Sequence, residues 1–329
     1  MRLFENICDL IGHTPLLRLK TGIPDPGPRA YVKLEFLNPT GSVKDRMALH
    51  IIRKALREGR LAPGDTVVDN SSGNTGASMA LVAGLHGLRS VVTTPVKTSK
   101  EKTDYMRSLG AEVIVTPELP HSDPASFYSV ARRLAKEMGY FDLDQYDSQD
   151  NIEAHYLTTG PEIWEDTDGR VTHFVCGIGT GGTMSGASRY LKERNRRIRT
   201  IAVDPEGSVF AEYLNHRREV EGYTYKVEGI GSDVMTKALD VDVIDEVITV
   251  SDRDAFQRAR QICREEGISA GGSSGAVAWA MEQVARELGP EALIVGLFAD
   301  GGIKYLSKCY NDEWMREMGF LEQPEKVTR

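Results

Sequence analysis

The sequence predicts an α/β protein made of two doubly wound domains. Three observations lead to this prediction. The chain has 329 residues, which is enough for two domains that each bury a core. Short runs rich in β-branched residues alternate with amphipathic stretches in both halves of the chain. Turns rich in glycine or hydroxyl groups connect several of these runs to the stretch that follows, which is typical of parallel sheets with helical crossovers.

In the first half, the alternation begins after an amphipathic stretch at residues 47–58. The predicted elements that follow are strands at 66–68, 91–93 and 112–115 and helices at 77–85 and 100–109. Gly110 closes the second of these helices. This order is a βαβ unit extended by one more helix and strand, so it predicts a parallel sheet.

The second half repeats the alternation. Here the predicted elements are strands at 173–176, 200–203, 246–250 and 293–297 and helices at 183–193, 254–266 and 275–288. Active sites of doubly wound folds lie at the carboxyl ends of the strands. The turns after those strands are therefore the places to look for chemistry.

Composition excludes several classes of function. The 48 acidic residues outnumber the 40 basic ones, giving a net charge of −8, and no long basic run is present to bind nucleic acid. The four cysteines are far apart and lack metal-ligand spacing: Cys8, Cys176, Cys263 and Cys309. No apolar run is long enough to span a membrane. We therefore expect a cytoplasmic protein with no metal, no nucleic-acid partner and no membrane partner.

The first of four informative turns carries Lys44 just before the predicted helix at 47–58. A cation is unfavourable at the amino end of a helix, because that end carries partial positive charge. In the ordinary interpretation Lys44 is solvated and paired with Asp45. In the alternative, Lys44 loses its proton easily and forms an imine with an aldehyde cofactor. This turn alone does not decide between them.

The second turn is Ser71-Ser72-Gly73-Asn74-Thr75-Gly76, between a predicted strand and a predicted helix. Backbone N–H groups at a helix start, with three hydroxyl groups and one amide beside them, make a seat for a carboxylate. Helix capping needs only one such side chain, and four are present. The turn therefore predicts a site for an amino-acid substrate.

The third turn, residues 177–183, has the sequence GIGTGGT and again joins a strand to a helix. Glycines allow the backbone to approach a phosphate closely, and the N–H groups and threonine hydroxyls can surround it. The same residues also match the GxGxxG pattern of dinucleotide-binding proteins, and Asp204 stands where a ribose-binding acid is expected. A nicotinamide-dependent dehydrogenase is therefore a rival hypothesis at this point.

The fourth turn, residues 270–276, contains Ser273 and opens another predicted helix. The hydroxyl group of Ser273 could face a ring nitrogen of a cofactor, or it could cap the helix.

Taken together and in this order, the motifs SVKDR, SSGNTG, GTGGT and GGSSG resemble the β-family of pyridoxal-phosphate enzymes, fold type II, which includes cystathionine β-synthases and cysteine synthases. The resemblance implies a fold like that of the tryptophan synthase β-chain, with the cofactor between two domains. The smaller domain would span residues 37–146, and the larger one residues 13–36 and 147–329. The nicotinamide hypothesis explains only one of the four turns.

The resemblance also implies roles for the cofactor-binding residues. Lys44 would form the Schiff base with pyridoxal 5′-phosphate and later move the α-proton. Asn74 would hydrogen-bond the ring hydroxyl group, and Ser273 would meet the pyridine nitrogen. The phosphate would be held by Gly179, Thr180, Gly181, Gly182 and Thr183.

The substrate carboxylate would bind to Ser71, Ser72, Thr75 and Gln145. Family members usually carry threonine where Ser71 stands, and the hydroxyl group is retained. The implied reaction is replacement of the β-substituent of L-serine or an O-activated L-serine, through an aminoacrylate intermediate, by a thiol nucleophile.

Residues 227–233 distinguish members of the family. Glu228 and Gly229 in this stretch resemble the cystathionine synthase version and would bind substrate, although a tyrosine is common there in place of Ser232. The best match is therefore an enzyme like cystathionine β-synthase. A cysteine synthase that uses O-acetylserine and sulfide, or an enzyme that uses an amine nucleophile, remains an alternative. A homodimer is expected from the family.

Overall fold

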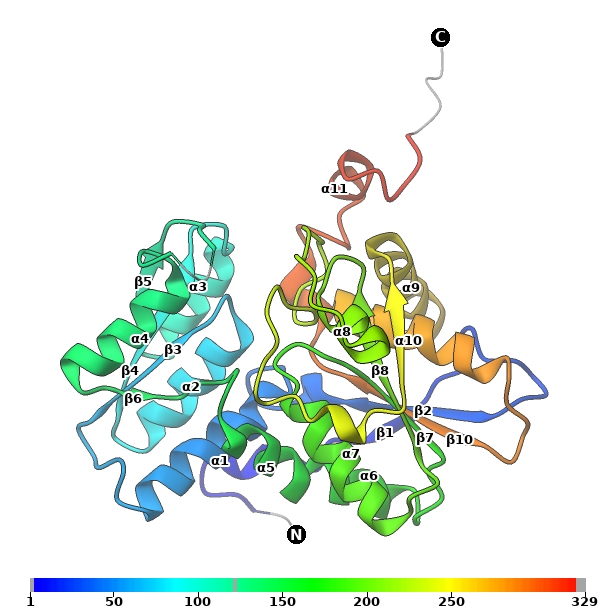
Figure 1. Cartoon of the computed structure of the whole chain (residues 1–329), viewed down its shortest axis with the longest axis horizontal. Coiled ribbons are helices and arrows are strands. Elements are labelled where there is room, and N and C mark those ends of the chain that lie inside the picture. Colours follow the sequence, from blue (N-terminus) through cyan, green and yellow to red (C-terminus); the bar gives the residue numbers. More distant parts are fainter. Residues whose placement is uncertain (1–2, 121–122, 324–329) are drawn as a thin grey trace.

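The computed structural model describes residues 3–120 and 123–323, and two sheets lie side by side in it (Figure 1). The smaller sheet has the strand order β5-β4-β3-β6, and all of its strand pairs are parallel. Its strands are β3 (Thr66–Asn70), β4 (Arg89–Pro95), β5 (Glu112–Thr116) and β6 (Phe141–Asp142). The parallel sheet predicted for the first half is thus confirmed, with β6 as an added strand.

Helices cover both faces of the smaller sheet because neighbouring strand residues point to opposite sides. These helices are α1 (Lys44–Arg57), α2 (Asn74–Leu85), α3 (Lys100–Ser108) and α4 (Phe127–Met138). Val67 and Val92 pack with residues of α1 and α2. Val68 and Val91 pack with Ala131 of α4 on the other face. This is the three-layer arrangement that the sequence predicts, although α4 itself was not predicted.

The larger sheet has the order β1-β2-β10-β7-β8-β9. Its strands are β1 (Leu16–Arg18), β2 (Arg29–Leu34), β7 (His173–Gly177), β8 (Arg199–Pro205), β9 (Glu246–Val250) and β10 (Leu293–Phe298). The pair β1–β2 is antiparallel, and the other pairs are parallel. The sequence predicted the four later strands but not β1 and β2. Because β1 pairs with β2 in the antiparallel direction, the sheet is mixed rather than purely parallel.

The larger sheet is also covered on both faces. Its helices are α5 (Gln149–Leu157), α6 (Thr159–Asp166), α7 (Gly182–Arg194), α8 (Phe210–His216), α9 (Asp252–Glu266) and α10 (Gly272–Ala285), and α11 (Asp312–Glu317) follows near the end of the described chain. Val175 and Ile201 pack with residues of α9 and α10. Phe174 and Ala202 pack with residues of α6 and α7 on the opposite face.

Predicted boundaries shift by a few residues. The first predicted helix starts at Lys44 rather than at residue 47, and the predicted helix at 275–288 spans Gly272–Ala285 instead. The division into a smaller domain at 37–146 and a larger domain at 13–36 and 147–329 remains a prediction. Residues 121–122 of the smaller domain and 324–329 of the larger one lie outside the described residues. In the described part of the chain, no helix combines the length and the apolar character needed to cross a membrane.

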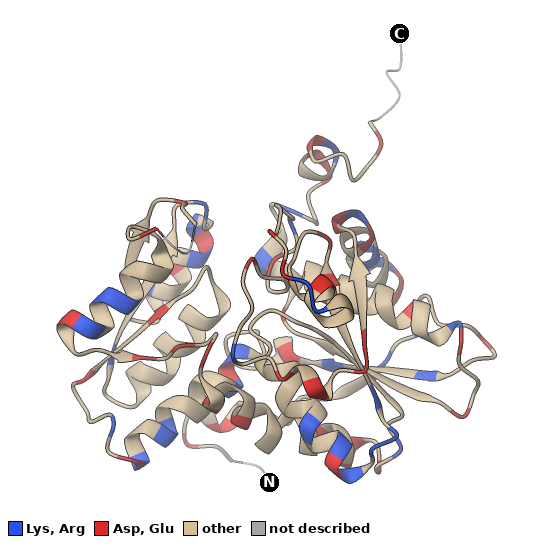
Figure 2. Ribbon diagram, viewed as in Figure 1, with Lys and Arg blue, Asp and Glu red and all other residues tan. Residues whose placement is uncertain are grey.

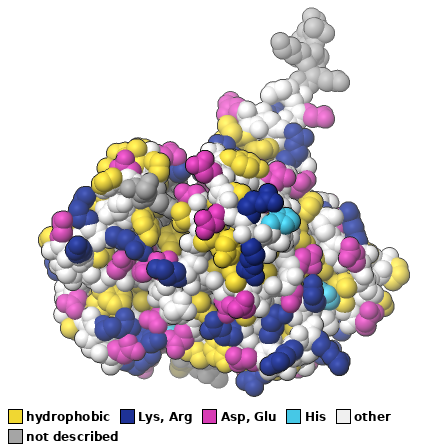
Figure 3. Space-filling model, in the orientation of Figure 1, with side chains coloured by type: hydrophobic (Ala, Val, Ile, Leu, Met, Phe, Trp, Pro, Cys, Tyr) yellow, Lys and Arg dark blue, Asp and Glu magenta, His cyan; other side chains and the backbone are white. Residues whose placement is uncertain are grey.

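Charged side chains of both signs are interspersed over the helices of both units (Figure 2). On the face shown in Figure 3, no patch of one sign dominates.

Candidate active site

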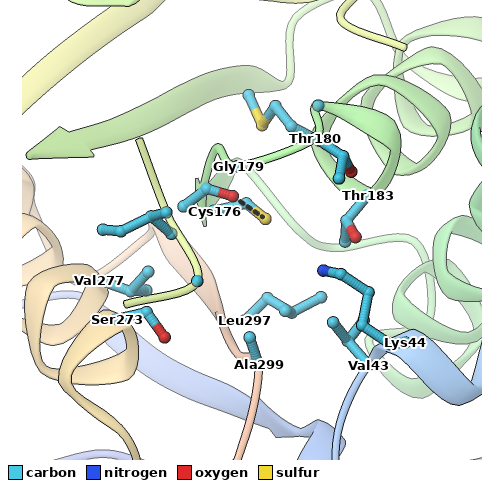
Figure 4. A pocket seen from close by; sticks show the side chains of 15 residues that line it. Val43, Lys44, Cys176, Gly179, Thr180, Thr183, Ser273, Val277, Leu297 and Ala299 are labelled. Atoms are coloured by element: carbon cyan, nitrogen blue, oxygen red, sulfur yellow. Dashed lines mark hydrogen bonds between the residues drawn. The ribbon is translucent and has the colours of Figure 1, made fainter. Parts of the chain in front are cut away.

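A cavity lies at the carboxyl end of β7, between the start of α1 and the start of α10 (Figure 4). Its lining residues are Val43, Lys44, Cys176, Gly177, Gly179, Thr180, Gly181, Thr183, Met184, Gly229, Ile230, Ser273, Val277, Leu297 and Ala299. The lysine turn, the glycine-rich turn and the serine turn therefore meet in one place. Gly182, the first residue of α7, belongs to the same turn without lining the cavity.

Lys44 is the first residue of α1, and its Nζ atom points into the cavity (Figure 4). The predicted alternative, an ion pair with Asp45, is wrong. The carboxylate of Asp45 instead accepts hydrogen bonds from the backbone N–H of Thr40 at 2.8 Å and from Ser78 Oγ at 2.5 Å. Burial is the main cause that lowers the pKa of Lys44. A lysine that loses its proton readily can act as a nucleophile toward an aldehyde.

The glycine-rich turn brings its backbone close to neighbouring segments. A Cβ atom on Gly179 would lie 2.6 Å from the backbone oxygen of Gly229. Gly181 has φ +93°, a left-handed conformation that favours glycine. The first N–H groups of α7 lack partners within the helix and lie beside the cavity, where the helix dipole favours an anion. This backbone fits a phosphate group.

The two threonines of this turn are held from α5. Thr180 Oγ1 accepts a hydrogen bond from Asn151 Nδ2 at 3.1 Å. Thr183 Oγ1 lies 3.1 Å from His155 Nε2. Burial lowers the pKa of His155 well below its usual range and so favours the neutral imidazole, which can accept a hydrogen bond from the threonine hydroxyl group. Sequence reasoning assigned a role at the site to neither supporting residue.

Ser273 lies on the side of the cavity opposite Lys44 (Figure 4). The predicted alternative, that this serine caps the helix, is wrong. The N-cap residue of α10 is Gly271, and no side chain caps this helix. Ser273 thus lines the cavity instead of capping the helix, and its contact with a cofactor ring stays a prediction.

The asparagine turn lies outside the set of residues that line the cavity. Asn74 begins α2, and its Nδ2 group donates to Asp300 Oδ2 at 2.8 Å. Its Oδ1 atom accepts a hydrogen bond from Lys304 Nζ at 2.6 Å. Sequence reasoning missed both partners as site residues, because they come from a segment more than 200 residues later in the chain.

The residues predicted to bind the substrate carboxylate lie around the start of α2 and at Gln145, and their role stays a prediction. Ser71 Oγ accepts hydrogen bonds from the N–H groups of Gly73 at 3.2 Å and Gly76 at 3.0 Å, so this one hydroxyl supports the start of α2. Thr75 Oγ1 donates to Gln145 Oε1 at 2.7 Å. The structure therefore brings Thr75 and Gln145 together, and Ser72 lies exposed beside them.

Residues of β3 hold the side-chain amide of Gln145 through hydrogen bonds. Its Nε2 group donates to Asp69 Oδ2 at 3.0 Å and to the backbone oxygen of Asn70 at 2.8 Å. Asp69 is fully buried, and burial, with Asp142 nearby, raises the pKa of its carboxyl group well above the usual range. A protonated Asp69 would place no negative charge behind the predicted carboxylate seat.

Glu228 lies between two lysines that the sequence did not single out as site residues. Its carboxylate forms ion pairs with Lys102 of α3 and with Lys308. These two cations hold the pKa of Glu228 below its usual range, even though burial acts in the opposite direction. Because α3 packs on the smaller sheet and Glu228 follows β8 of the larger sheet, this ion pair links the part of the chain around one sheet to the part around the other. Gly229, the next residue, lines the cavity with φ +88°.

Asp204, the acid on which the nicotinamide hypothesis depends, does not face the cavity. It is fully buried at the end of β8, and its Oδ2 atom accepts a hydrogen bond from the N–H of Ala211 at 2.9 Å. Burial raises the pKa of this carboxyl group to about 7. Asp204 therefore supports the start of α8 and is not placed to bind a ribose.

Within residues 3–120 and 123–323, no group of three His, Cys, Asp or Glu side chains is arranged to hold a metal ion. The four cysteines are free thiols in the structure. The donor set of the cavity is an amine, a serine hydroxyl and a glycine-rich helix start. These groups fit an aldehyde cofactor that carries a phosphate.

Comparison with known proteins agrees with this geometry. The family model described as "Pyridoxal-phosphate dependent enzyme" matches residues 7–300. Cystathionine beta-synthases are similar over nearly the whole chain: that of Apis mellifera is 41% identical over 98% of this chain, and those of Mus musculus and Saccharomyces cerevisiae are 40% identical over 100% and 95%. The chain spans only 59% to 64% of the length of these relatives.

Solved structures are similar over the full length. A crystal structure of O-ureido-L-serine synthase superposes with a TM-score of 0.88 at 32% identity and covers 99% of both chains. A mutant of an O-ureido-L-serine synthase with O-ureido-L-serine bound gives a TM-score of 0.86 at 33% identity, covering 97% of this chain and 99% of that one.

Proposed function

Because the chain belongs to the family of pyridoxal-phosphate dependent enzymes, we propose that it replaces the β-substituent of L-serine or of an O-activated L-serine. One observation carries the proposal: Lys44, the glycine-rich turn and Ser273 line the same cavity. Pyridoxal 5′-phosphate is the cofactor of this family. When bound, it supplies an electron-withdrawing ring that makes the α-proton of an amino acid easier to remove.

Lys44 is the residue that moves protons in this proposal. Its lowered pKa favours the neutral form of the amine at Nζ, and a neutral amine can accept the α-proton of the donor amino acid. Gly179, Thr180, Gly181, Gly182 and Thr183 would bind the phosphate through backbone N–H groups and hydroxyls. Ser273 would hydrogen-bond the ring nitrogen without adding a charge.

The carboxylate of the donor amino acid would bind at Ser71, Ser72, Thr75 and Gln145. The support for this role is the contact of Thr75 with Gln145, together with the N–H groups at the start of α2. Closing this side over the substrate would exclude water from the reacting carbon.

A thiol is the acceptor that we favour, because the cystathionine beta-synthases are 40% to 41% identical to this chain. Glu228 would orient the acceptor from its position beside Gly229, which lines the cavity. A second candidate is an acceptor that is not an amino-acid thiol, such as sulfide or an amine-type nucleophile. The match to two O-ureido-L-serine synthase structures extends over 99% of each of those chains and favours an acceptor other than an amino-acid thiol.

The test is a visible absorption spectrum of the purified protein, recorded after separate additions of L-serine, O-acetyl-L-serine and O-phospho-L-serine. Homocysteine, sulfide or an amine is then added to the sample that has changed. A band that shifts with one donor and returns with one acceptor identifies both half-reactions. A protein that stays colourless after addition of pyridoxal phosphate would exclude the cofactor.

Replacement of Glu228 tests the acceptor site. Glu228→Ala should leave the donor-induced spectral change intact and slow the return of the band by roughly tenfold, since a hydrogen bond to a charged group is lost. Glu118→Ala, which removes an exposed ion pair with Lys97, is the matched control and should have no effect. An equal loss in the donor step would contradict the assignment of Glu228 to the acceptor.

We also expect from the family resemblance that the chain forms a homodimer and acts in the cytoplasm. Sedimentation of the holoprotein would test the first expectation, and fractionation of cells the second.

A further inference from the structure

Residues 299–305, directly after β10, are attached to two of the four turns through the backbone. The oxygen of Ala299 accepts from the N–H of Val43 at 2.8 Å, next to Lys44. The oxygen of Asp300 accepts from the N–H of Gly271 at 3.0 Å, in the serine turn. This segment lies outside the four turns, yet it joins the lysine turn to the serine turn.

Lys304 extends this connection to the asparagine turn. Its Nζ atom donates to Asn74 Oδ1 at 2.6 Å and to the backbone oxygen of Gly41 at 3.2 Å. Gly41 stands three residues before Lys44 in the turn that leads into α1. The partly buried Lys304 thus links the turn that carries Lys44 with Asn74, the residue predicted to bind the ring hydroxyl group.

The chemistry of lysine determines which way the Asn74 amide points. An ammonium group can only donate hydrogen bonds, so it must face the oxygen of the amide. The NH₂ group of Asn74 therefore points away from Lys304, where one hydrogen goes to Asp300 Oδ2 at 2.8 Å. Tyr305 donates to the same carboxylate oxygen at 2.7 Å, which holds Asp300 in place. The second hydrogen of the NH₂ group is available for a ligand oxygen.

We propose that Lys304 is a positioning residue for the cofactor: it orients the Asn74 amide so that its NH₂ group donates to the ring hydroxyl group of pyridoxal phosphate, and it ties Asn74 to the turn that carries Lys44. The inference rests on the cofactor assignment of the proposed function and is independent of which donor and acceptor the enzyme uses.

The charge of Lys304 has a second effect, on Lys44. Burial is the largest cause that lowers the pKa of Lys44, and the ammonium group of Lys304 acts in the same direction. Asp300 and Cys176 act in the opposite direction. Burial favours the neutral form of His155, which also interacts electrostatically with Lys44. Removing the positive charge at position 304 should therefore raise the pKa of Lys44.

The experiment compares Lys304→Met, which removes both donor and charge, with Lys304→Arg, which keeps them. Cofactor is removed by dialysis, and each protein is titrated with pyridoxal phosphate while the visible band is recorded. Lys304→Met should bind the cofactor roughly tenfold more weakly, as expected for the loss of a charge-assisted hydrogen bond. The pH midpoint of the rate of cofactor capture should also move upward, because only the neutral amine of Lys44 reacts. Lys304→Arg should restore most of both values.

Ile303→Ala is the matched control, because this neighbouring side chain is 79% exposed and should leave both measurements unchanged. Wild-type affinity and an unchanged pH midpoint in Lys304→Met would overturn the inference. So would a Lys304→Arg protein as impaired as Lys304→Met. If the wild-type protein itself binds no pyridoxal phosphate, the proposed function falls as well, so the two failures are distinguishable.

Discussion

The two sides of the candidate site offer different groups to a ligand: mainly backbone on one side and mainly side chains on the other. The glycine-rich turn at residues 177–183 offers mainly backbone, and its shape is set by close approaches such as that of Gly179 to Gly229. The asparagine turn at residues 71–76 offers mainly side chains. These side chains already have protein partners: Thr75 bonds to Gln145, and Asn74 bonds to Asp300 and Lys304.

This difference separates two kinds of binding. A backbone seat at a helix start is fixed before a ligand arrives, so little has to move when a phosphate binds. A seat made of paired side chains must exchange internal hydrogen bonds for bonds to the ligand. We therefore expect the cofactor side to be preformed and the substrate side to rearrange when the donor amino acid binds.

Lys44, which lies between the two sides, should show the largest effect. Lys44→Ala should abolish the visible band of the bound cofactor and lower turnover by roughly a hundred- to ten-thousand-fold, because the proton-transfer group is lost. The spectrum and steady-state turnover are the measurements. Lys54→Ala is a control further along α1, where Lys54 pairs with Asp150 of α5 and does not line the cavity. Normal turnover in Lys44→Ala would refute the assignment.

The next largest effect is expected on the backbone side. In Gly179→Ala the added Cβ atom would lie 2.6 Å from the oxygen of Gly229, so the turn must shift and cofactor affinity should fall about tenfold or more. Titration with pyridoxal phosphate measures this. The control is Gly84→Ala in α2, where the nearest atom is 3.9 Å away and alanine should stabilise the helix by about 1 kcal/mol. Unchanged affinity in Gly179→Ala would break the distinction between the two sides.

On the side-chain side, Thr75→Val removes the hydroxyl group that donates to Gln145. The KM for the donor amino acid should rise by about three- to tenfold, while cofactor affinity stays unchanged. Thr158→Val, which removes a helix hydroxyl bonded to the backbone of Ala154, serves as the control. Weaker cofactor binding in Thr75→Val, with an unaltered KM, would reverse the assignment of the two sides.

The last effect concerns the free energy of unfolding and leaves cofactor and substrate binding unchanged; it involves Asp204 at the end of β8. The pKa of Asp204 is raised from 3.8 to about 7 in the folded state, so the folded protein keeps a proton that the unfolded chain loses. Stability therefore falls as pH rises between these two values.

Asp204→Asn carries no such proton. The stability of this variant relative to the wild type should grow by about 1–3 kcal/mol from pH 5 to pH 8, measured by urea unfolding. Cofactor affinity should be unchanged, since Asp204 does not line the cavity. A stability difference that is independent of pH would contradict the raised pKa.

Much of the fold could be predicted from local pattern. The strand at 246–250 has the predicted bounds, and the glycine-rich turn joins β7 to α7 as predicted. The antiparallel pair β1–β2 was missed because β1 has only three residues and both strands lie before the regular alternation begins. The helices α4, α5 and α6 were missed as well, although α5 supplies Asn151 and His155 to the phosphate side of the site.

The sequence by itself determined the fold class, because the alternation of strand and helix patterns is local. It also determined the family and the three turns that meet at the cavity, because each motif consists of consecutive residues. Only the tertiary structure decided the partners of those turns. Lys304 reaches Asn74 across 230 positions, and Lys102 reaches Glu228 across 126. Contacts between residues so far apart leave no local pattern, since they arise only when the two sheets pack beside each other.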